Sequence, residues 1–262
     1  MTVQNKTVHT KAVIAGILTA RAGIAAVGLA TLFVLAGCAT APPADDKEAV
    51  AAFNEANDPF EPLNRYFFEV NRGIDHLLLR PVSEIYRGVL PDHARNSVRS
   101  FINNLETPGI LMHDLMQGET ERAWESFGRL ATNTAVGPLG LNDVAAGDSL
   151  KNPDAGIPFH DEDLGQTLAV WGMGSGPYLM LPVFGPSNVR DTIGLALNFY
   201  INPVNYLVPE KNRTNFAAAR TIIRGIDIRS RNIESFDEIE RGAIDFYATV
   251  RSLYRQYRAS EI

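Results

Sequence analysis

The side chains able to do covalent or metal chemistry are few and lie far apart in this sequence. Cys38 is the only cysteine, which excludes an intramolecular disulfide framework and a cysteine-rich zinc or iron–sulfur site. The run 160–163, His-Asp-Glu-Asp, has metal-binding side-chain types, but it lacks the spacing of an EF-hand loop, and no His-Glu-x-x-His pair occurs. We interpret this run as a solvated acidic loop and predict no metal site.

Catalytic and nucleotide-binding patterns are equally weak. No Gly-x-Ser-x-Gly sequence marks a serine nucleophile, although a Ser-His-Asp triad assembled in space stays open. The glycines of 172–176 lack the spacing of a nucleotide loop, and Pro177 removes a backbone donor where a helix would begin. We therefore predict no enzyme and no nucleotide or metal cofactor. The net charge of −6 also argues against nucleic acid as a partner, because nucleic-acid binders need a basic surface.

Cys38 follows a segment typical of secretory signals. Residues 1–37 contain Lys6, Lys11 and Arg21 but no acid, and they end in the uncharged run 22–37. This run is shorter than the roughly 20 residues of a comfortable bilayer crossing, so a signal peptide is favoured over a membrane span. A free cysteine after an ordinary signal, or in an uncleaved anchor, is the alternative to the modified cysteine considered next.

The four residues Leu-Ala-Gly-Cys at 35–38 resemble the lipobox of bacterial lipoproteins. In such proteins the cysteine thiol takes a diacylglycerol and the freed amine takes a third acyl chain. The resemblance implies covalent lipid on Cys38, and two or more chains hold a protein stably at a membrane. In typical enterobacterial lipoproteins an Asp after the cysteine retains the protein at the inner membrane. Ala39 stands there in this chain, which favours the outer membrane.

The mature chain divides into a tether and a helical body. We expect the signal at 1–37, the acylated cysteine with its tether at 38–56, and the body at 57–262. The tether contains two prolines and then becomes acidic and alanine-rich, and a short helix over 46–56 stays open. Several Gly/Pro-rich loops interrupt the body, at 137–158, 172–186 and 202–209.

Apolar residues recur every three or four positions through the body, which predicts an all-α domain of about seven or eight helices. Pro62 suits the first turn of one helix and Pro81 is expected to close it. Apolar faces also run through 119–134 and 188–200, the second with Ser187 as its N-cap. Residues 239–257 are expected to form one helix after a capping box at 235 and 238. No run of strict period-two alternation predicts a sheet.

An ordered series of short motifs runs along the body of the chain. The series runs through residues 57–206, and the last fifty residues show only a general helical character. The motifs are NDPFEPLNR at 57–65, RP at 80–81, FINNL at 101–105 with Pro108, LMQG at 115–118, GR at 128–129, NT at 133–134, LGQTL at 164–168, WG at 171–172, GPY at 176–178, LP at 181–182, GPS at 185–187 and RD at 190–191.

Together these motifs resemble the MlaA (VacJ) family of outer-membrane lipoproteins. The resemblance implies a function in lipid traffic. Members of the family are ring-like helical domains partly embedded in the outer membrane from its periplasmic face. An amphipathic channel removes mislocalised phospholipids from the outer leaflet and passes them to an MlaC-like periplasmic shuttle, which maintains lipid asymmetry. Trimeric porins are membrane partners. The alternatives are an envelope scaffold that binds porins without moving lipid, and a phospholipase.

Two groups of residues are candidates for contact with lipid. An apolar and aromatic stretch is broken too often by glycine and proline to form a helix, and we expect it to line or gate the lipid path; an ordinary core-packing loop is the alternative. It comprises Trp171, Met173, Tyr178, Leu179, Met180, Leu181, Val183 and Phe184. Guanidinium groups suit phosphate oxygens, and buried ion pairs are the alternative for them. The arginines are Arg65, Arg80, Arg129 and Arg190.

Overall fold

A computed structural model describes residues 42–43, 45–147 and 156–262. The predicted signal peptide 1–37 and the lipidation site Cys38 lie outside these described residues. The chain divides into two compact units, the first ending at Tyr66 and the second comprising Phe67–Ile262. In the first unit, α2 (Lys47–Ala56) forms the helix that the sequence left open. Asp46 caps it by accepting a hydrogen bond from the backbone N–H of Ala49.

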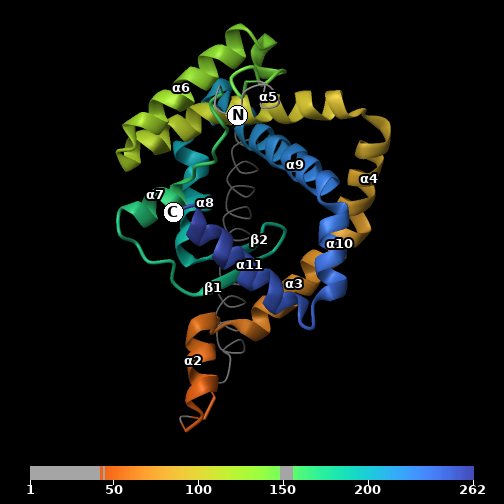
Figure 1. Ribbon diagram of the computed structural model, residues 1–262, viewed down its shortest axis with the longest axis vertical. Helices are drawn as coiled ribbons and strands as arrows, with labels where there is room; N and C mark the ends of the chain where they lie inside the picture. Colours follow the sequence, from red (N-terminus) through yellow and green to blue (C-terminus); the bar gives the residue numbers. More distant parts are fainter. Residues whose placement is uncertain (1–41, 44, 148–155) are drawn as a thin grey trace, which may run out of the picture. The chain divides into compact units, whose positions relative to one another are not determined.

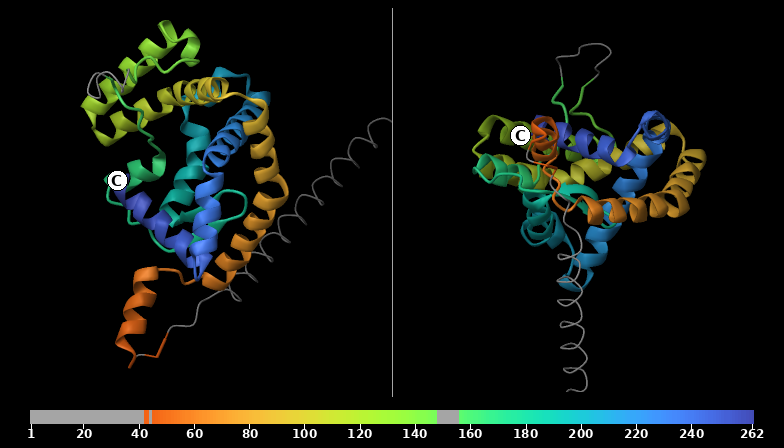
Figure 2. Two further views of the ribbon diagram at one scale, coloured as in Figure 1. Left: turned by 45° about the vertical axis from the view of Figure 1, so that its right-hand side comes forward. Right: turned by 90° about the horizontal axis from the view of Figure 1, so that it is seen from below.

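The second unit is mainly helical, as the periodicity predicts. Three pairs of helices pack against each other, namely α5 with α6, α7 with α8 and α4 with α9. Figures 1 and 2 both show α5 and α6 side by side. The elements from α3 onward are α3 (Glu61–Ile74), the π-helix η1 (Asp75–Leu79), α4 (Arg80–Val89), α5 (Asp92–Gln117), α6 (Thr120–Ala135), η2 (Pro138–Gly140), α7 (Leu164–Val170), β1 (Tyr178–Leu181), β2 (Gly185–Asn188), α8 (Val189–Ile201), η3 (Pro203–Leu207), η4 (Glu210–Asn212), α9 (Arg213–Arg231), α10 (Ile233–Gly242) and α11 (Phe246–Ser260).

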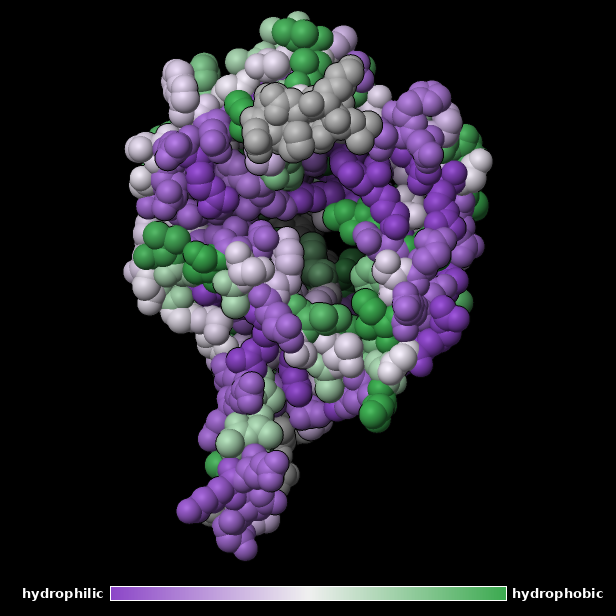
Figure 3. Space-filling view, viewed as in Figure 1, coloured by the Kyte–Doolittle hydropathy of each residue, from purple (hydrophilic) through white to green (hydrophobic). Residues whose placement is uncertain are grey.

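The helices of the second unit follow one another around a central opening. Figure 3 shows this opening as a hollow with hydrophobic residues on its lower and right-hand walls. Among the helices that the structure describes, none combines the length and the apolar character that a bilayer crossing requires.

A short β-hairpin corrects the expectation that the body contains no sheet. Strands β1 and β2 are antiparallel, with Tyr178 opposite Asn188 and Leu181 opposite Gly185. Each strand has four residues, and β2 reads Gly-Pro-Ser-Asn, so neither carries an alternation long enough to be recognised. The stretch is indeed not helical, but it is a hairpin rather than an irregular loop. Asn188, not Ser187, caps α8 by accepting from the N–H of Asp191.

Pro81 does not end the first helix of the body, contrary to the prediction. The chain instead widens into the π-helical turn η1 and continues directly into α4, where Pro81 lies in the first turn. A proline is tolerated there because its missing N–H belongs to the new first turn, and π turns accommodate such irregularities within a helix.

The C-terminal helix is broken where the sequence predicts one continuous helix. α10 ends at Gly242, and α11 begins after Asp245, which caps it by accepting from the N–H of Ala248. Glycine after one periodic run and aspartate before the next are stop and start signals that the apolar periodicity masked. The break redirects the chain so that Tyr247, 2% exposed, enters the aromatic core.

Helix α6 buries its polar face and exposes its apolar one. Ser126, Arg129 and Asn133 are buried on one side, whereas Trp124 and Phe127 are 74% and 47% exposed on another. The two exposed rings stack at 5.4 Å. Among the described residues, buried side chains are more often polar than apolar. An exposed apolar patch such as this face of α6 is typical of a surface that contacts a membrane or another protein.

The crossing of α7 and α8 depends on two glycines. A Cβ added to Gly194 would lie 2.6 Å from the backbone nitrogen of Gly165. We expect Gly194→Ala to lower the free energy of unfolding by about 1–3 kcal/mol because the backbones must separate. Gly88→Ala is the matched control: its Cβ meets nothing within 4 Å, and it is expected to stabilise by about 0.5–1 kcal/mol. Urea denaturation measures both, and equal effects would contradict the close packing.

Candidate functional site

An amphipathic cavity of about 310 Å³ lies inside the second unit. Its walls come from α3, η1, the hairpin, α9, α10 and α11. One part is apolar and the other is charged. The apolar residues include Phe68, Met180, Val183, Phe184, Phe236 and Phe246, and the charged ones are Arg72, Asp75, Arg229 and Glu240, with His76 beside them.

The aromatic core below the hairpin fixes the apolar wall. Tyr178 and Met180 point to the same side of β1 and are 2% and 3% exposed. They pack with Phe68 of α3 and Tyr247 of α11. The ring centroids of Phe68 and Tyr247 are 5.5 Å apart and those of Tyr178 and Tyr247 are 6.2 Å apart, both edge to face. The hairpin is therefore anchored at its strand, while its turn projects toward the cavity.

Asn71 holds the turn of the hairpin from below. Its amide nitrogen donates to the carbonyl of Leu181 at 2.9 Å, and its amide oxygen accepts from the N–H of Val183 at 2.7 Å. Val183 has a φ of 70°, a conformation that β-branched residues rarely adopt. These two hydrogen bonds counterbalance that strain, so a side chain of α3 positions the exposed turn that carries Val183 and Phe184.

Removing this clamp should loosen the turn. We expect Asn71→Leu to lower the free energy of unfolding by about 1–3 kcal/mol, because the amide that satisfies the turn is lost. The N–H of Val183 should then exchange with deuterium faster than in the wild type, and hydrogen-exchange mass spectrometry measures this. Peptides from α6 serve as the internal control, since α6 lies elsewhere in the unit. Unchanged exchange at 181–185 would refute the clamp.

The charged wall consists of ion pairs that leave donors unused. Arg229 binds Asp75 with two hydrogen bonds of 2.8 and 2.9 Å, and Arg72 binds Glu240. The hydrogen bond to Glu240 raises the pKa of Arg72 above its ordinary value. Arg229 Nη1 and Arg72 Nε are buried and have no hydrogen-bond partner among the residues that the structure describes. The wall thus holds two buried guanidinium N–H donors that lack an acceptor among the described residues.

The structure gathers only some of the lipid-path candidates at this cavity. Met180, Val183 and Phe184 line it. Tyr178 lies in the aromatic core, and Leu179 and Leu181 are half-buried beside the cavity lining. Trp171 and Met173 precede the hairpin and are exposed. The indole N–H of Trp171 donates to the carbonyl of Met116 at 3.0 Å, which ties this residue to α5.

The four candidate arginines all form ion pairs. Only Arg129 and Arg190 form the buried pairs that the sequence left open, because the side chains of Arg65 and Arg80 are 41% and 33% exposed. None of them lines the cavity of the second unit. Arg129 is buried and donates twice to Asp143, at 2.8 and 2.7 Å. The other pairs are Arg65 with Glu61 at 2.7 Å, Arg80 with Asp237 at 2.8 Å and with Glu84 at 3.1 Å, and Arg190 with Asp191 at 2.9 Å.

Sequence reasoning missed the two arginines that do line the cavity. Arg229 lies in the C-terminal part of the chain, where the family motifs give no guidance. Arg72 lies one turn after Phe68 in α3 and looks like a solvent-facing helix residue. Only the long-range pairs, Arg229 with Asp75 and Arg72 with Glu240, bring them together. No local pattern predicts pairs separated by more than 150 residues.

The acidic run 160–163 is not the solvated loop that we predicted. Glu162 is 7% exposed, pairs with Arg122 at 3.0 Å and accepts from Gln117. Asp163 caps α7 in a reciprocal capping box with Gln166. Burial raises the pKa of Glu162. Among the described residues, no cluster of three or more metal-ligating side chains forms.

A serine, a histidine and an aspartate do meet in space, between α5 and α6. Ser126 Oγ donates to Asp114 Oδ2 at 2.7 Å, and His160 Nε2 lies 3.3 Å from Ser126 Oγ and 3.1 Å from Asp114 Oδ1. In a nucleophilic triad the two imidazole nitrogens serve different partners. Here one nitrogen faces both, and Ser126 is 1% exposed. This arrangement suits a buried polar network rather than an activated nucleophile.

Comparison with known proteins identifies the family. A family model described as MlaA lipoprotein matches residues 56–261. The intermembrane phospholipid transport system lipoprotein MlaA of Escherichia coli is 30% identical over 201 residues, which are 76% of each chain. Its Haemophilus influenzae counterpart is 27% identical over 230 residues, 87% of this chain and 86% of that one.

A solved structure supports the same assignment. It is described as the structural basis for maintenance of bacterial outer membrane lipid asymmetry, and it matches with a TM-score of 0.65 and 31% identity. The match covers 78% of this chain and 98% of that one. The predicted all-helical, ring-like fold is thereby confirmed, apart from its hairpin. The chain belongs to the MlaA lipoprotein family.

Proposed function

We propose that this protein transports phospholipids at the bacterial outer membrane and that lipid passes through the 310 Å³ cavity. One observation carries the proposal: a hydrophobic wall faces a wall with unused guanidinium donors. Acyl chains would contact the first, near Met180 and Phe184, and the phosphate would meet Arg229 and Arg72. Burial of each acyl CH₂ contributes about 0.8 kcal/mol, and guanidinium groups match phosphate oxygens.

The names of the similar proteins agree with this proposal, because two of them are intermembrane phospholipid transport lipoproteins. The exposed apolar face of α6 suits contact with lipid, since Trp124 and Phe127 face outward. On this proposal the acylated Cys38 anchors the chain at the periplasmic face, and the body is partly embedded. Lipid leaving the outer leaflet would pass to a periplasmic shuttle, with porins as membrane partners.

Mass spectrometry of the protein purified in detergent tests the proposal. One spectrum gives the mass at Cys38 and a second gives the identity of copurified lipid. We expect a triacylated Cys38 and intact diacyl phospholipid above a detergent-matched control. Transfer of labelled phospholipid from donor vesicles to acceptor vesicles then measures transport. Acylated protein that neither retains nor transfers phospholipid would contradict the proposal, and released fatty acid would indicate hydrolysis instead.

A further inference from the structure

A second cavity, of about 260 Å³, lies between α5, α8 and α9. Its wall is polar, unlike that of the first cavity, and the first cavity shares none of its lining residues. Amide and hydroxyl side chains from α8 and α9 alternate with charged groups. The lining residues that matter are Glu106, Asn198, Asn202, Arg220, Thr221 and Arg224, together with the acidic run 161–163.

The carboxylates on this wall each have a strong partner. Burial raises the pKa of Glu106 even though arginines surround it. The negative charges are thus already met by arginines. The ion pairs are Arg224 with Glu106 and Asp161, Arg122 with Glu162 at 3.0 Å, and Arg258 with Asp163 at 2.6 Å.

Arg220 is the arginine that remains poorly neutralised. Its side chain is only 10% exposed, and its closest carboxylate oxygen, Oε1 of Glu106, is 3.7 Å away. Arg224 pairs with the other oxygen of that carboxylate, Oε2. Its Nη2 donates to Asn205 at a long 3.4 Å, and its Nη1 has no hydrogen-bond partner among the described residues. Burial lowers the pKa of Arg220. A buried cationic donor without an acceptor is costly, which favours binding of an anion.

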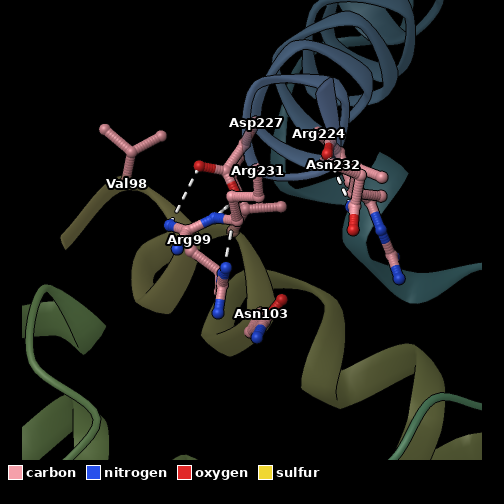
Figure 4. Close-up of a pocket in the computed structure, with 9 residues that line it drawn as sticks. Val98, Arg99, Asn103, Arg224, Asp227, Arg231 and Asn232 are labelled. Atoms are coloured by element: carbon pink, nitrogen blue, oxygen red, sulfur yellow. Dashed lines mark hydrogen bonds and ion pairs between the residues drawn. The ribbon is translucent and has the colours of Figure 1, made fainter. Parts of the chain in front are cut away.

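A neighbouring pocket of about 170 Å³ lies between α5 and α9, and its arginines, unlike Arg220, lie close to a carboxylate. There Arg99 and Arg231 turn toward the buried carboxylate of Asp227 (Figure 4), with nitrogen–oxygen distances of 3.4 and 2.9 Å. Each of these two arginines thus has a carboxylate partner within the protein, although they share it. Arg224 lines both this pocket and the second cavity, which we call the Arg220 cavity. Ile228 lines both this pocket and the first cavity. Helix α9 therefore borders all three.

We propose that the Arg220 cavity binds a phosphate group, with Arg220 donating to it from α9 and with the amide of Asn202 donating to it from the C-terminal end of α8. The amide oxygen of Asn202 already accepts from the N–H of Val204, which leaves its NH2 group to donate to the anion. The hydroxyl of Thr221 donates to the carbonyl of Ala217, so Thr221 lines the cavity without being a donor to the anion. A volume of 260 Å³ is several times the roughly 30 Å³ of a water molecule. The phosphate comes either from a phospholipid headgroup moving along α9 or from free phosphate. Only the lipid source rests on the proposed transport function.

The test uses the full-length acylated protein in a phosphate-free detergent. Inorganic phosphate and dihexanoyl phosphatidylglycerol are titrated separately, and ³¹P line broadening reports binding. Arg220→Gln removes the charge, and Thr221→Glu places a competing carboxylate on the wall while Arg220 stays. Arg213→Gln is the matched control on the same helix, because Arg213 stacks on Tyr206 at 4.1 Å and does not line the cavity.

We expect the wild type and Arg213→Gln to bind alike, and Arg220→Gln and Thr221→Glu to bind at least about tenfold more weakly, as for loss of a charge-assisted hydrogen bond. Binding of the lipid alone would identify a headgroup site, and binding of both probes a general phosphate site. Wild-type affinity in Thr221→Glu and Arg220→Gln would overturn the proposal. If Arg220→Gln fails to fold, Thr221→Glu alone decides. A wild type that binds neither probe but still transfers lipid would refute this site and leave the proposed transport intact.

Discussion

Replacing Arg258 by glutamine is expected to lower the free energy of unfolding by about 3 kcal/mol, the largest stability effect among these variants. Arg258, on α11, pairs with Asp163 at the start of α7 and with Asp191 in the first turn of α8, at 2.6 and 2.8 Å. The side chains of Arg258 and Asp191 are 12% and 9% exposed. Glutamine would leave both carboxylates without this cation, and Asp191 would stay buried.

The same substitution should change how stability depends on pH. Burial by itself raises the pKa of Asp191, but hydrogen bonds from Arg258, Tyr254 and Arg190 outweigh it and hold that pKa below its ordinary value. A carboxyl group whose folded pKa is depressed stabilises the protein above its unfolded pKa, about 3.9, and loses that contribution as pH falls through the folded pKa. Without Arg258 we expect a smaller loss of stability below pH 4.

Urea denaturation followed by circular dichroism measures both effects. Arg87→Gln is the matched control, because Arg87 pairs with Glu234 across a surface where the two side chains are 37% and 69% exposed. An exposed pair of this kind contributes about 0–1 kcal/mol. Equal destabilisation by the two substitutions would mean that the pairing of Arg258 does not hold α11 against α7 and α8.

These pairs illustrate what the sequence can and cannot predict. Helix α6 follows from its apolar period, whereas the sequence only left the short helix α2 open. Which face of α6 is buried does not follow. The period shows which residues share the apolar face, but it does not show whether the protein core or another apolar environment contacts that face. Phe127 marks the apolar face and is nevertheless exposed.

The apolar residues of the first cavity could be predicted from the sequence, but the polar residues that accompany them could not. Phe184 and Val183 stand out as apolar residues among glycines and prolines, so the sequence indicates them as candidates. Their partners Arg229 and Asn71 stand out in no local pattern, because distant contacts select them. The short strand β2 likewise depends on pairing with β1 and on α11 packing beneath the hairpin. The periodicity of apolar residues along the chain does not predict such long-range contacts.

Phospholipid transfer should fall at least tenfold in Phe184→Asp, the largest functional effect that we expect. Phe184 lines the cavity from the turn of the hairpin, and its side chain is 61% exposed, so the fold does not depend on it. A carboxylate there would face acyl chains and would also repel the phosphate that Arg72 and Arg229 are proposed to bind. Placing an unpaired charge against hydrocarbon costs several kcal/mol, and each 1.4 kcal/mol is tenfold.

The measurement is transfer of labelled phospholipid between vesicles, with circular dichroism confirming the fold. Phe184→Leu should retain most of the activity, because it keeps the apolar contact. Ile244→Asp is the charge-matched control: Ile244 is fully exposed in the connection between α10 and α11 and does not line the cavity. If Phe184→Asp transfers lipid at the wild-type rate, the hairpin turn is not part of the lipid path. If Ile244→Asp is impaired equally, the loss reflects added charge on the protein rather than the cavity wall.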